Sequence, residues 1–362
     1  MANNMDGMNY IPEGLPAPVV KPGEFVIAAI GMDHGHIYGM TGSLIDAGAT
    51  LKWAYDPDPI KLAAFLKRYP NAKAARSEDE ILSDPEVKLV ASACVTSERA
   101  ALGIRVMKAG KDYFVDKAPL TTLDQLKDVR RTIAETGRKY AVCYSERLQN
   151  EAAIFAGNLI EAGEIGKVVQ VIGMGPHRLG AAGRPDWFFI KKHYGGILCD
   201  IGSHQIEQFL HFTGASSASI VNAKIGNYNH PEYPELDDFG DATLVADTGA
   251  SCYFRVDWFT PDGLGTWGDG RTFILGTDGY IELRKYIDLA KSRGGNHVLW
   301  ANKSGEHYVD ATRKTGFPYF GKLIRDCIDR TETAMTQEHA LLAAELCVRC
   351  QLEATELTGR KL

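Results

Sequence analysis

The chain of 362 residues has no excess of positive charge, since 40 lysines and arginines face 46 aspartates and glutamates. With a net charge of −6 and no basic run, it is not expected to bind nucleic acid. It also lacks an apolar run of about 18 residues, so no membrane-spanning helix is expected. The N-terminal segment has neither the charged start nor the apolar centre of a secretory signal.

Cysteines are few, and their number is odd. The seven are scattered through apolar segments without the spacing of a disulfide framework, which predicts reduced thiols and a cytoplasmic protein. Cys347 and Cys350 form a single C-x-x-C pair within a helical pattern, and core packing explains them better than metal or redox chemistry. The histidines show no ligand spacing that stands out, so no metal site is expected.

The apolar content of 45% and the length suffice for about two domains with their own cores. Residues 1–23 are rich in proline and predict an extended arm. From Glu24 onward, short apolar runs alternate with helical patterns, which predicts a doubly wound parallel sheet in a domain over 24–146. Its strands are expected at 25–30, 50–55, 89–94, 113–115 and 140–143.

The pattern changes after residue 146. A helix over 150–162 precedes β-rich runs separated by turns such as Asp262-Gly263 and Asp278-Gly279. These runs predict an open, mainly antiparallel sheet in a second α/β domain over 147–362. Its strands are expected at 168–174, 219–225, 242–247, 251–258, 271–275 and 280–283, and its closing helices at 319–329 and 337–357.

Two glycines, Gly195 and Gly196, open a helical pattern that contains Asp200 and His204. Residues four apart lie on one face of a helix, so this carboxylate and this imidazole are expected to address one point. Histidine titrates near neutral pH, and the pair therefore suits proton transfer. A solvated polar face would give the same spacing, so the pair alone does not establish catalysis.

The first expected strand ends at Gly31, and a helix follows it, which is where a dinucleotide pyrophosphate binds. The usual G-x-G-x-x-G pattern is not met, because Asp33 and His36 occupy its later glycine positions. Asp33 is expected to point away from the phosphates. Asp56 ends the second strand and would bind the adenosine ribose, favouring NAD over NADP; Asp58 is the competing choice.

The chain resembles the Gfo/Idh/MocA family of glucose–fructose oxidoreductases and inositol dehydrogenases. The resemblance rests on four features in this order: the glycine turn, Asp56, the pair Asp116-Lys117 and the run from Gly195 to His204. The resemblance covers nearly the whole chain from Glu24. It implies an N-terminal Rossmann domain and a C-terminal α/β domain whose open sheet makes oligomer contacts. A homo-oligomer, as a dimer, tetramer or hexamer, is therefore expected.

The same resemblance implies that Lys117 contacts both the nicotinamide ribose and the substrate. Two departures from the family pattern are present. Asp116 replaces the glutamate of a Glu-Lys-Pro motif, whose proline comes one place late as Pro119. The Asn-x-Arg motif appears as Ser145-Glu146-Arg147, which still follows the fifth strand.

The expected roles fall into three groups. Catalysis is assigned to Lys117, Asp200 and His204. Cofactor binding is assigned to Gly31, Asp33, His34, Gly35, His36, Asp56, Thr96, Lys117, Ser145 and Glu146. Substrate binding is assigned to Lys117, Tyr144, His177, Arg178, Arg184, Trp187, Asp200 and His204, since polar groups beside an aromatic ring suit a sugar.

These residues favour an NAD-dependent oxidoreductase that acts on a ring secondary alcohol of a sugar, glycoside or cyclitol. The tract 258–288 resembles that of relatives that oxidise glycosides at the 3-hydroxyl. A second reading is glycoside cleavage through a 3-keto intermediate, which needs an additional base that the sequence does not reveal. A third is a nucleotide-binding regulator. The proline-rich arm resembles, in position, one that some members wrap round a neighbour.

Overall fold

The computed structural model describes residues 7–290 and 294–358, so the ends of the expected arm and of the expected second domain lie outside it. The chain divides into two compact units. The Rossmann unit comprises residues 8–143 and 316–341, and the mixed-sheet unit comprises mainly residues 144–315 and the segment from 342 onward. The division therefore differs from the expected one, because residues 316–341 return to the N-terminal unit.

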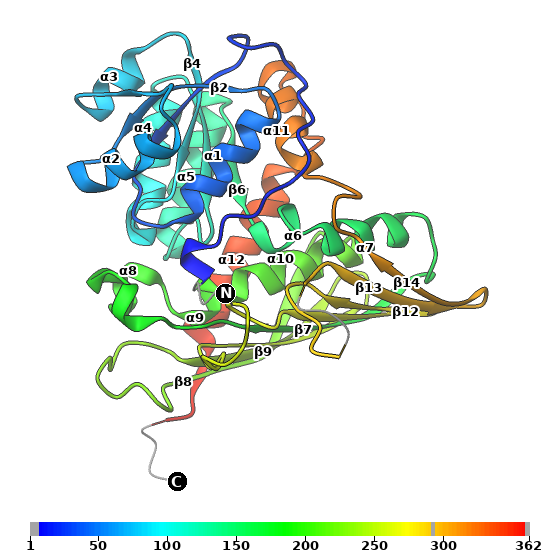
Figure 1. Cartoon of the computed structure of the whole chain (residues 1–362). Coiled ribbons are helices and arrows are strands. Elements are labelled where there is room, and N and C mark those ends of the chain that lie inside the picture. Colours follow the sequence, from blue (N-terminus) through cyan, green and yellow to red (C-terminus); the bar gives the residue numbers. More distant parts are fainter. Residues whose placement is uncertain (1–6, 291–293, 359–362) are drawn as a thin grey trace. The chain divides into compact units, whose positions relative to one another are not determined.

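The Rossmann unit is built on a six-stranded parallel sheet of order β3-β2-β1-β4-β5-β6. Figure 1 labels β2, β4 and β6 of this sheet. Its strands are β1 (Val26–Ile30), β2 (Thr50–Tyr55), β3 (Lys73–Ala74), β4 (Val87–Ser92), β5 (Asp112–Asp116) and β6 (Tyr140–Cys143). Its helices are α1 (His36–Asp46), α2 (Pro59–Arg68), α3 (Glu78–Ser83), α4 (Arg99–Lys108), α5 (Leu123–Thr136) and α11 (Pro318–Asp329). The central strands are almost wholly buried, as a sheet covered on both faces requires.

The mixed-sheet unit has nine strands in the order β14-β13-β12-β11-β7-β10-β9-β8-β15. They are β7 (Val168–Pro176), β8 (Ala218–Gly226), β9 (Phe239–Ala246), β10 (Ser251–Asp257), β11 (Arg271–Gly276), β12 (Gly279–Arg284), β13 (His297–Asn302), β14 (Gly305–Asp310) and β15 (Thr355–Glu356). The expected antiparallel character holds for most pairs, whereas β10 with β7 and β15 with β8 are parallel.

Further helices complete the chain: α6 (Ser145–Leu148), α7 (Glu151–Glu161), α8 (Lys191–Tyr194), α9 (Ile197–Asp200), α10 (Gly202–Thr213) and α12 (Gln337–Glu353), with short 3-10 helices η1 (Gly7–Asn9), η2 (Thr96–Glu98), η3 (Ala181–Gly183) and η4 (Asp186–Phe189). The expected C-terminal helix to residue 357 is too long, since α12 ends at Glu353 and β15 follows. A bilayer-spanning helix is absent from the described part of the chain.

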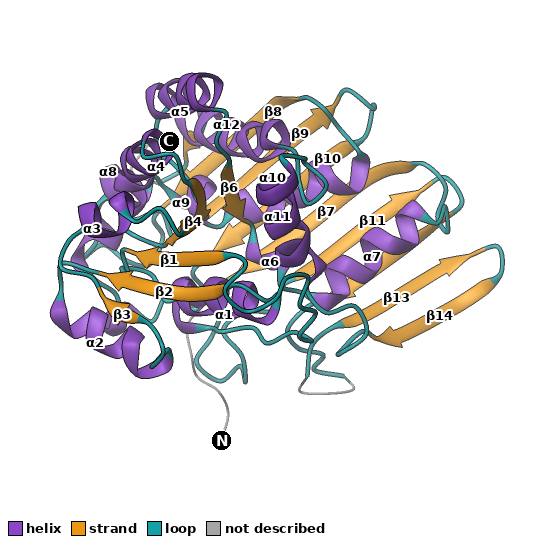
Figure 2. Cartoon of the chain, turned by 90° about the horizontal axis from the view of Figure 1, so that it is seen from above, coloured by secondary structure: helices purple, strands orange, loops and turns teal. Residues whose placement is uncertain are grey.

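Helices α7 and α10 lie on one face of the nine-stranded sheet (Figure 2). Two glycines of β7 make the close approach of α10 possible. A Cβ atom on Gly173 would lie 2.2 Å from Oε1 of Gln205, and one on Gly175 would lie 2.9 Å from its Nε2. The packing therefore fixes the first turns of α10, which carry His204, against the centre of the sheet.

The proline-rich arm packs on its own Rossmann unit. The amides of Ala17 and Val19 donate to the carbonyls of Asp46 and Ala47, at 3.2 and 2.9 Å, where α1 ends. Gly14 lies against the ring of Phe317. The described part of the arm is thus bound to α1 and α11 of the same chain.

Candidate functional site

The turn after β1 is one that glycine alone fits. Gly31 has a φ of +76°, and a Cβ atom there would lie 2.5 Å from Cβ of Cys94. Its amide donates to the carbonyl of Tyr55 at 3.0 Å, and the amide of His34 donates to that of Ala93 at 2.9 Å. The chain therefore passes tightly over the carboxyl ends of β1, β2 and β4 before α1 begins.

Two acids after β2 have different partners. The carboxylate of Asp56 accepts hydrogen bonds from the amides of Met32, at 2.6 Å, and Asp58, at 2.8 Å. Asp56 is buried, and burial raises the pKa of its carboxyl group. The carboxylate of Asp58 instead caps α2 through the amide of Ile60 at 2.8 Å. Asp56 is therefore the acid that is tied to the glycine turn.

Asp33, expected to point away from the phosphates, is engaged by neighbouring elements. Its carboxylate forms an ion pair with Lys61 of α2 and accepts a hydrogen bond from the amide of Val95 at 3.2 Å. The lysine neutralises a charge that would repel an anion near this turn. Gly35, at the start of α1, carries no side-chain cap, and Met8 of the arm lies against it.

Asp116, at the end of β5, is the centre of a buried cluster. Nδ1 of His36 lies 2.9 Å from its Oδ1, and Nδ1 of His34 lies 3.5 Å from its Oδ2. Arg99 reaches Oδ2 at 3.2 Å. Burial opposes ionisation of Asp116, but His36 and Arg99 outweigh it and hold the pKa of this carboxyl well below its usual range. Burial, with the charge of His36, lowers the pKa of His34.

Among the residues that the structure describes, His34, His36 and Asp116 are the group whose ligand atoms lie close enough to suit a metal, within 4.8 Å of one another. The sequence did not point to it. Arg99 already pairs with Asp116, and Lys117 lies beside it, so the local charge opposes a second cation.

The backbone of Lys117 is held on both sides. Its amide donates to Oδ1 of Asp116 at 2.9 Å, and its carbonyl accepts a hydrogen bond from Arg99. The guanidinium also reaches the carbonyls of Ala118, at 3.0 Å, and Cys94, at 2.8 Å. Asp116 thus fixes this segment although it replaces the glutamate of the family pattern. Arg99 is 1% exposed, and no motif in the sequence predicts its part in this site.

In the mixed-sheet unit, the expected single helix through Asp200 and His204 is wrong. The helix is interrupted at Ile201, which separates α9 from α10. The hydroxyl of Ser203 donates to the carbonyl of Asp200 at 2.8 Å, while the amide of His204 bonds to the carbonyl of Ile201 at 3.1 Å. A serine that bonds to the backbone in this way competes with the regular helical pattern.

The two glycines before α9 are required by position. Gly195 and Gly196 both have a φ of +89°. A Cβ atom on Gly196 would lie 2.1 Å from Cδ of Gln351, which accepts from the amide of Leu198 at 3.0 Å and donates to Asp237 at 3.0 Å. The glycine pair therefore lets α9 begin against α12.

Glu146 of α6, expected to bind the cofactor, lies in a buried polar network. It is 3% exposed, and Lys285, 1% exposed, places Nζ 2.8 Å from its Oε2. Nε2 of Gln205 donates to the same oxygen at 3.3 Å. No pattern in the sequence pointed to Lys285, because 139 positions separate the two charges.

The network reaches two histidines. Nε2 of His177 lies 3.7 Å from Oε1 of Glu146. Lys285 donates to Oε1 of Gln208 at 2.9 Å, and Gln208 donates to the carbonyl of His204 at 2.8 Å. Burial opposes ionisation of Glu146, but Lys285, followed by His204 and His177, lowers the pKa of this carboxyl well below its usual range.

His177 belongs to an aromatic wall. Its ring centroid lies 4.5 Å from that of Trp267 and 5.5 Å from that of Trp258, and Arg184 stacks on Trp258 at 4.5 Å. Nδ1 of His177 lies 3.1 Å from the carbonyl of Gly175, which can only accept, so this nitrogen carries the hydrogen. The other ring nitrogen of His177, Nε2, is the one that faces the carboxylate of Glu146.

The other expected substrate residues have varied surroundings. Arg178 donates to the carbonyls of Pro261 and Leu264, each at 2.8 Å, and so holds a loop. Trp187 is half-buried in η4. Tyr144 is fully buried before α6, and Ser145 begins that helix. Thr96, buried in η2, follows β4 in the Rossmann unit.

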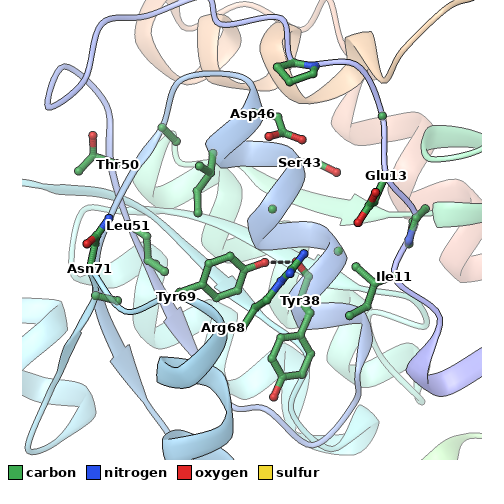
Figure 3. A pocket seen from close by; sticks show the side chains of 18 of the residues that line it. Ile11, Glu13, Tyr38, Ser43, Asp46, Thr50, Leu51, Arg68, Tyr69 and Asn71 are labelled. Carbon is green, nitrogen blue, oxygen red and sulfur yellow. Dashed lines mark hydrogen bonds between the residues drawn. The ribbon is translucent and has the colours of Figure 1, made fainter. Parts of the chain in front are cut away.

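A cavity of about 590 Å³ lies between the arm and α1 (Figure 3). Its wall includes Glu13, Asp46, Arg68 and Tyr69, and the hydroxyl of Tyr69 donates to the carbonyl of Tyr38. The cavity adjoins the start of β2, whereas ligands of parallel α/β sheets bind at the carboxyl ends of the strands. It is therefore separate from the glycine turn.

Comparison with known proteins gives matches over both units. The family described as "Oxidoreductase family, NAD-binding Rossmann fold" matches residues 27–144, and the "GFO/IDH/MocA C-terminal domain" matches residues 155–282. Scyllo-inositol 2-dehydrogenase (NAD(+)) of Bacillus subtilis is 29% identical over 258 residues, or 69% of this chain and 71% of the relative. D-xylose dehydrogenase of Paenarthrobacter nicotinovorans is 26% identical over 149 residues, or 40% and 38%.

Solved structures extend the likeness. A protein of Erwinia carotovora atroseptica, described only as an oxidoreductase, is 48% identical with a TM-score of 0.90, over 92% of this chain and all of the other. Levoglucosan dehydrogenase, solved with NADH, has a TM-score of 0.75 at 18% identity, over 91% of this chain and 98% of the enzyme. At 18% identity, the likeness to levoglucosan dehydrogenase shows a shared fold only.

Proposed function

Because the chain belongs to the Gfo/Idh/MocA family of oxidoreductases with an NAD-binding Rossmann fold, we propose that it oxidises a ring secondary alcohol to a ketone. The observation that carries this proposal is the buried environment of His204. It is 2% exposed, its backbone is fixed by Gln208 and Ile201, and it interacts electrostatically with Glu146. An imidazole whose backbone is fixed and whose charge is coupled to that of a carboxylate suits a general base.

The reaction breaks two bonds of the alcohol. The O–H bond gives its proton to Nε2 or Nδ1 of His204, and the carbinol C–H bond gives up a hydride with both electrons. NAD, when bound, supplies the acceptor for that hydride. Asp200 would orient His204 and stabilise the imidazolium, and Lys117 would stabilise the alkoxide as it develops. In the reverse direction the same groups protonate a ketone.

The residues at the glycine turn fit a dinucleotide. Gly31 leaves no room for a side chain, Gly35 provides no side-chain cap for α1, and Lys61 neutralises Asp33. Nδ1 of His34 accepts from the first amide of α1, that of His36, at 3.2 Å. Asp56, buried at the end of β2, would bind the ribose hydroxyls and disfavour a 2′-phosphate. The proposed cofactor-binding set is completed by residues of both units. They are His34, Gly35, His36 and Thr96 of the Rossmann unit, and Ser145 and Glu146 of the mixed-sheet unit.

For the substrate we propose a sugar, glycoside or cyclitol. Two relatives, an inositol dehydrogenase and a xylose dehydrogenase, act on compounds of this kind by name. The half-buried Trp187 is the proposed ring face for the C–H side of a sugar, and Arg184 is the proposed polar neighbour. Trp258 and Trp267, each 5% exposed, instead pack on the ring of His177. Oxidation at the 3-hydroxyl of a glycoside rests on the resemblance of residues 258–288.

Glycoside cleavage through a 3-keto intermediate is the second candidate. That reaction needs a further base, and His177 beside Glu146 is a residue of suitable chemistry. Product analysis separates the two, because cleavage releases the aglycone and oxidation leaves it attached. As part of the same proposal, the protein is cytoplasmic, forms a homo-oligomer and has no nucleic-acid partner.

The proposal is tested by mixing the protein, at stoichiometric concentration, with glucosides, free hexoses and inositols. The nicotinamide absorbance near ~340 nm is followed with and without added NAD. A rise with one class of compound supports the proposal and identifies the substrate class. NAD binding without a rise for any compound would instead favour a nucleotide-binding regulator.

A further inference from the structure

Lys285 forms a buried ion pair with Glu146, and the proposed reaction assigns no role to this lysine. Nζ of Lys285 lies 2.8 Å from Oε2 of Glu146, and the two residues are 1% and 3% exposed. Two charges out of water are costly to bury, and such a pair is weak evidence for stability alone. The pair is therefore a candidate for a role in the chemistry of its neighbours.

The surroundings of the pair connect it with His204 by two routes. Lys285 donates to Gln208, which in turn donates to the carbonyl of His204, one turn away on α10. Glu146 interacts with His204 through its charge, and Gln205, next to His204 in sequence, donates to the same carboxylate. The route through Gln208 fixes the backbone of His204. The route through Glu146 couples the charge of the carboxylate with that of the imidazole ring.

The carboxylate of Glu146 has capacity left for a partner. Oε2 accepts from Lys285 and Gln205, whereas Oε1 has no hydrogen-bond donor among the described residues and faces Nε2 of His177 at 3.7 Å. A buried carboxylate oxygen in this state favours a nearby imidazole in its protonated form. It therefore suits a group that gains a proton during turnover.

We propose that Glu146, held in place by Lys285, is the counter-charge for the imidazole of His204 when that ring takes up the proton of the substrate alcohol. Both are positioning residues, and Lys285 also limits how strongly the carboxylate attracts the proton. This inference rests on the proposed role of His204 as the base. It adds a second carboxylate to Asp200 and assigns a function to the glutamate that departs from the family pattern.

Other ionisable groups on the elements packed against α10 have partners of their own. Arg147 of α6 forms an ion pair with Glu207 of α10, and Arg255 forms one with Asp257 in β10. Further ionisable groups on these elements include Asp200 of α9, Glu151 and Glu161 of α7, Asp241 of β9, His211 of α10 itself and His177 after β7. The test must therefore isolate the charge of Glu146 from theirs.

The test is a pH titration of the histidines by NMR on the full chain with isotope-labelled histidine. The chain has 10 histidines, and a His204→Gln variant identifies the signal of His204. Glu146→Gln removes the negative charge, so the midpoint of His204 should fall by about one unit. Lys285→Met removes a positive charge near both Glu146 and His204. The proton that these two residues share should therefore bind at a higher pH, whether it resides on Glu146 or on His204.

Glu282→Gln is the matched control. Glu282 lies three positions before Lys285 and pairs with Arg284, so this variant removes a carboxylate of β12, the strand that ends just before Lys285, without touching Glu146. It should leave the His204 midpoint where it is. An unchanged midpoint in Glu146→Gln, or shifts of the same sign in the two variants, would overturn the inference.

The titration needs no substrate, so its result does not depend on the proposed reaction. If no alcohol is oxidised but the shifts appear, the proposed function fails and the electrostatic coupling stands. Where a substrate is found, the acid limb of the kcat/KM profile should move in the same directions as the NMR midpoints. A merely structural pair would lower activity without moving that limb.

Discussion

The histidine at the start of α10 is the residue on which the proposed chemistry depends. His204→Ala removes the proton acceptor while the glycine turn and Asp56 stay intact. Turnover should fall by about 10²–10⁴-fold, with NAD affinity unchanged. Stopped-flow kinetics and calorimetric titration with NAD measure the two quantities.

His307→Ala serves as the control for His204→Ala. His307 lies in β14 of the same unit, and its ring stacks on that of Trp300 with 4.7 Å between the centroids. It should turn over as the unaltered chain does. If His204→Ala were equally active, His204 would not be the base, and His177 would become the residue to examine.

The two acids after β2 offer a second comparison. Asp56→Ala should lower the preference for NAD over NADP at least ~10-fold, since it removes the acceptor for ribose hydroxyls and the repulsion of a 2′-phosphate. Asp58→Ala removes a helix cap instead. It should cost about 1 kcal/mol of stability and leave the cofactor ratio unchanged. Binding titrations with both cofactors decide, and the opposite pattern would transfer the ribose role to Asp58.

At the scale of elements, the glycine pair before α9 sets the position of the proposed catalytic helices. Gly196→Ala places a Cβ at a φ of +89° and displaces Gln351, which would give up bonds to Leu198 and Asp237. The strain costs about 1–2 kcal/mol, and each lost bond costs about 1 kcal/mol more.

Gly214→Ala is the control for that variant, because Gly214 also has a positive φ but no atom of the described residues would lie within 4 Å of a Cβ added there. It should show the backbone strain alone. Thermal unfolding compares the two variants, and an equal loss in melting temperature would mean that Gln351 moves aside without cost.

Several elements could be predicted to their ends from the sequence. The ends of helix α5 follow from local sequence signals, because Thr122 and Gln125 form a capping box and Gly137 ends the helix in a left-handed conformation. The strands β2 and β6 are also as expected. By contrast β13 and β14 were missed, since β14 is the edge strand, β13 lies next to it, and the side chains of both are partly exposed.

The candidate site was predictable only where it follows from local pattern. The glycine turn and Asp56 follow from the order of one strand, one helix and the next strand. The break at Ile201 depends on the hydroxyl of Ser203, and the ion pair of Glu146 depends on Lys285, which a different element supplies. Neither leaves a periodic signal in the sequence.

For the molecule as a whole, the resemblance implies association through the open sheet. Leu275 and Tyr280 face each other on β11 and β12 and are 48% and 52% exposed. Light scattering should give a multiple of 39.7 kDa for the unaltered chain. A Leu275→Lys, Tyr280→Lys double variant should shift toward the monomer with its circular dichroism unchanged.

Ile60→Lys is the control for association, since Ile60 is 79% exposed on α2, outside the sheet. It should leave the mass unchanged. A monomer for the unaltered chain, or dissociation by Ile60→Lys alone, would contradict assembly through the sheet.

The most direct measurement is of hydride transfer itself. Perdeuterated glucose, methyl glucoside and inositol are each mixed with the protein and NAD, and the nicotinamide is examined by mass spectrometry. We predict that one of these alcohols delivers a single deuterium to the nicotinamide ring, and that His204→Ala delivers almost none. Binding of NAD without deuterium transfer from any ring alcohol would contradict the proposed dehydrogenase.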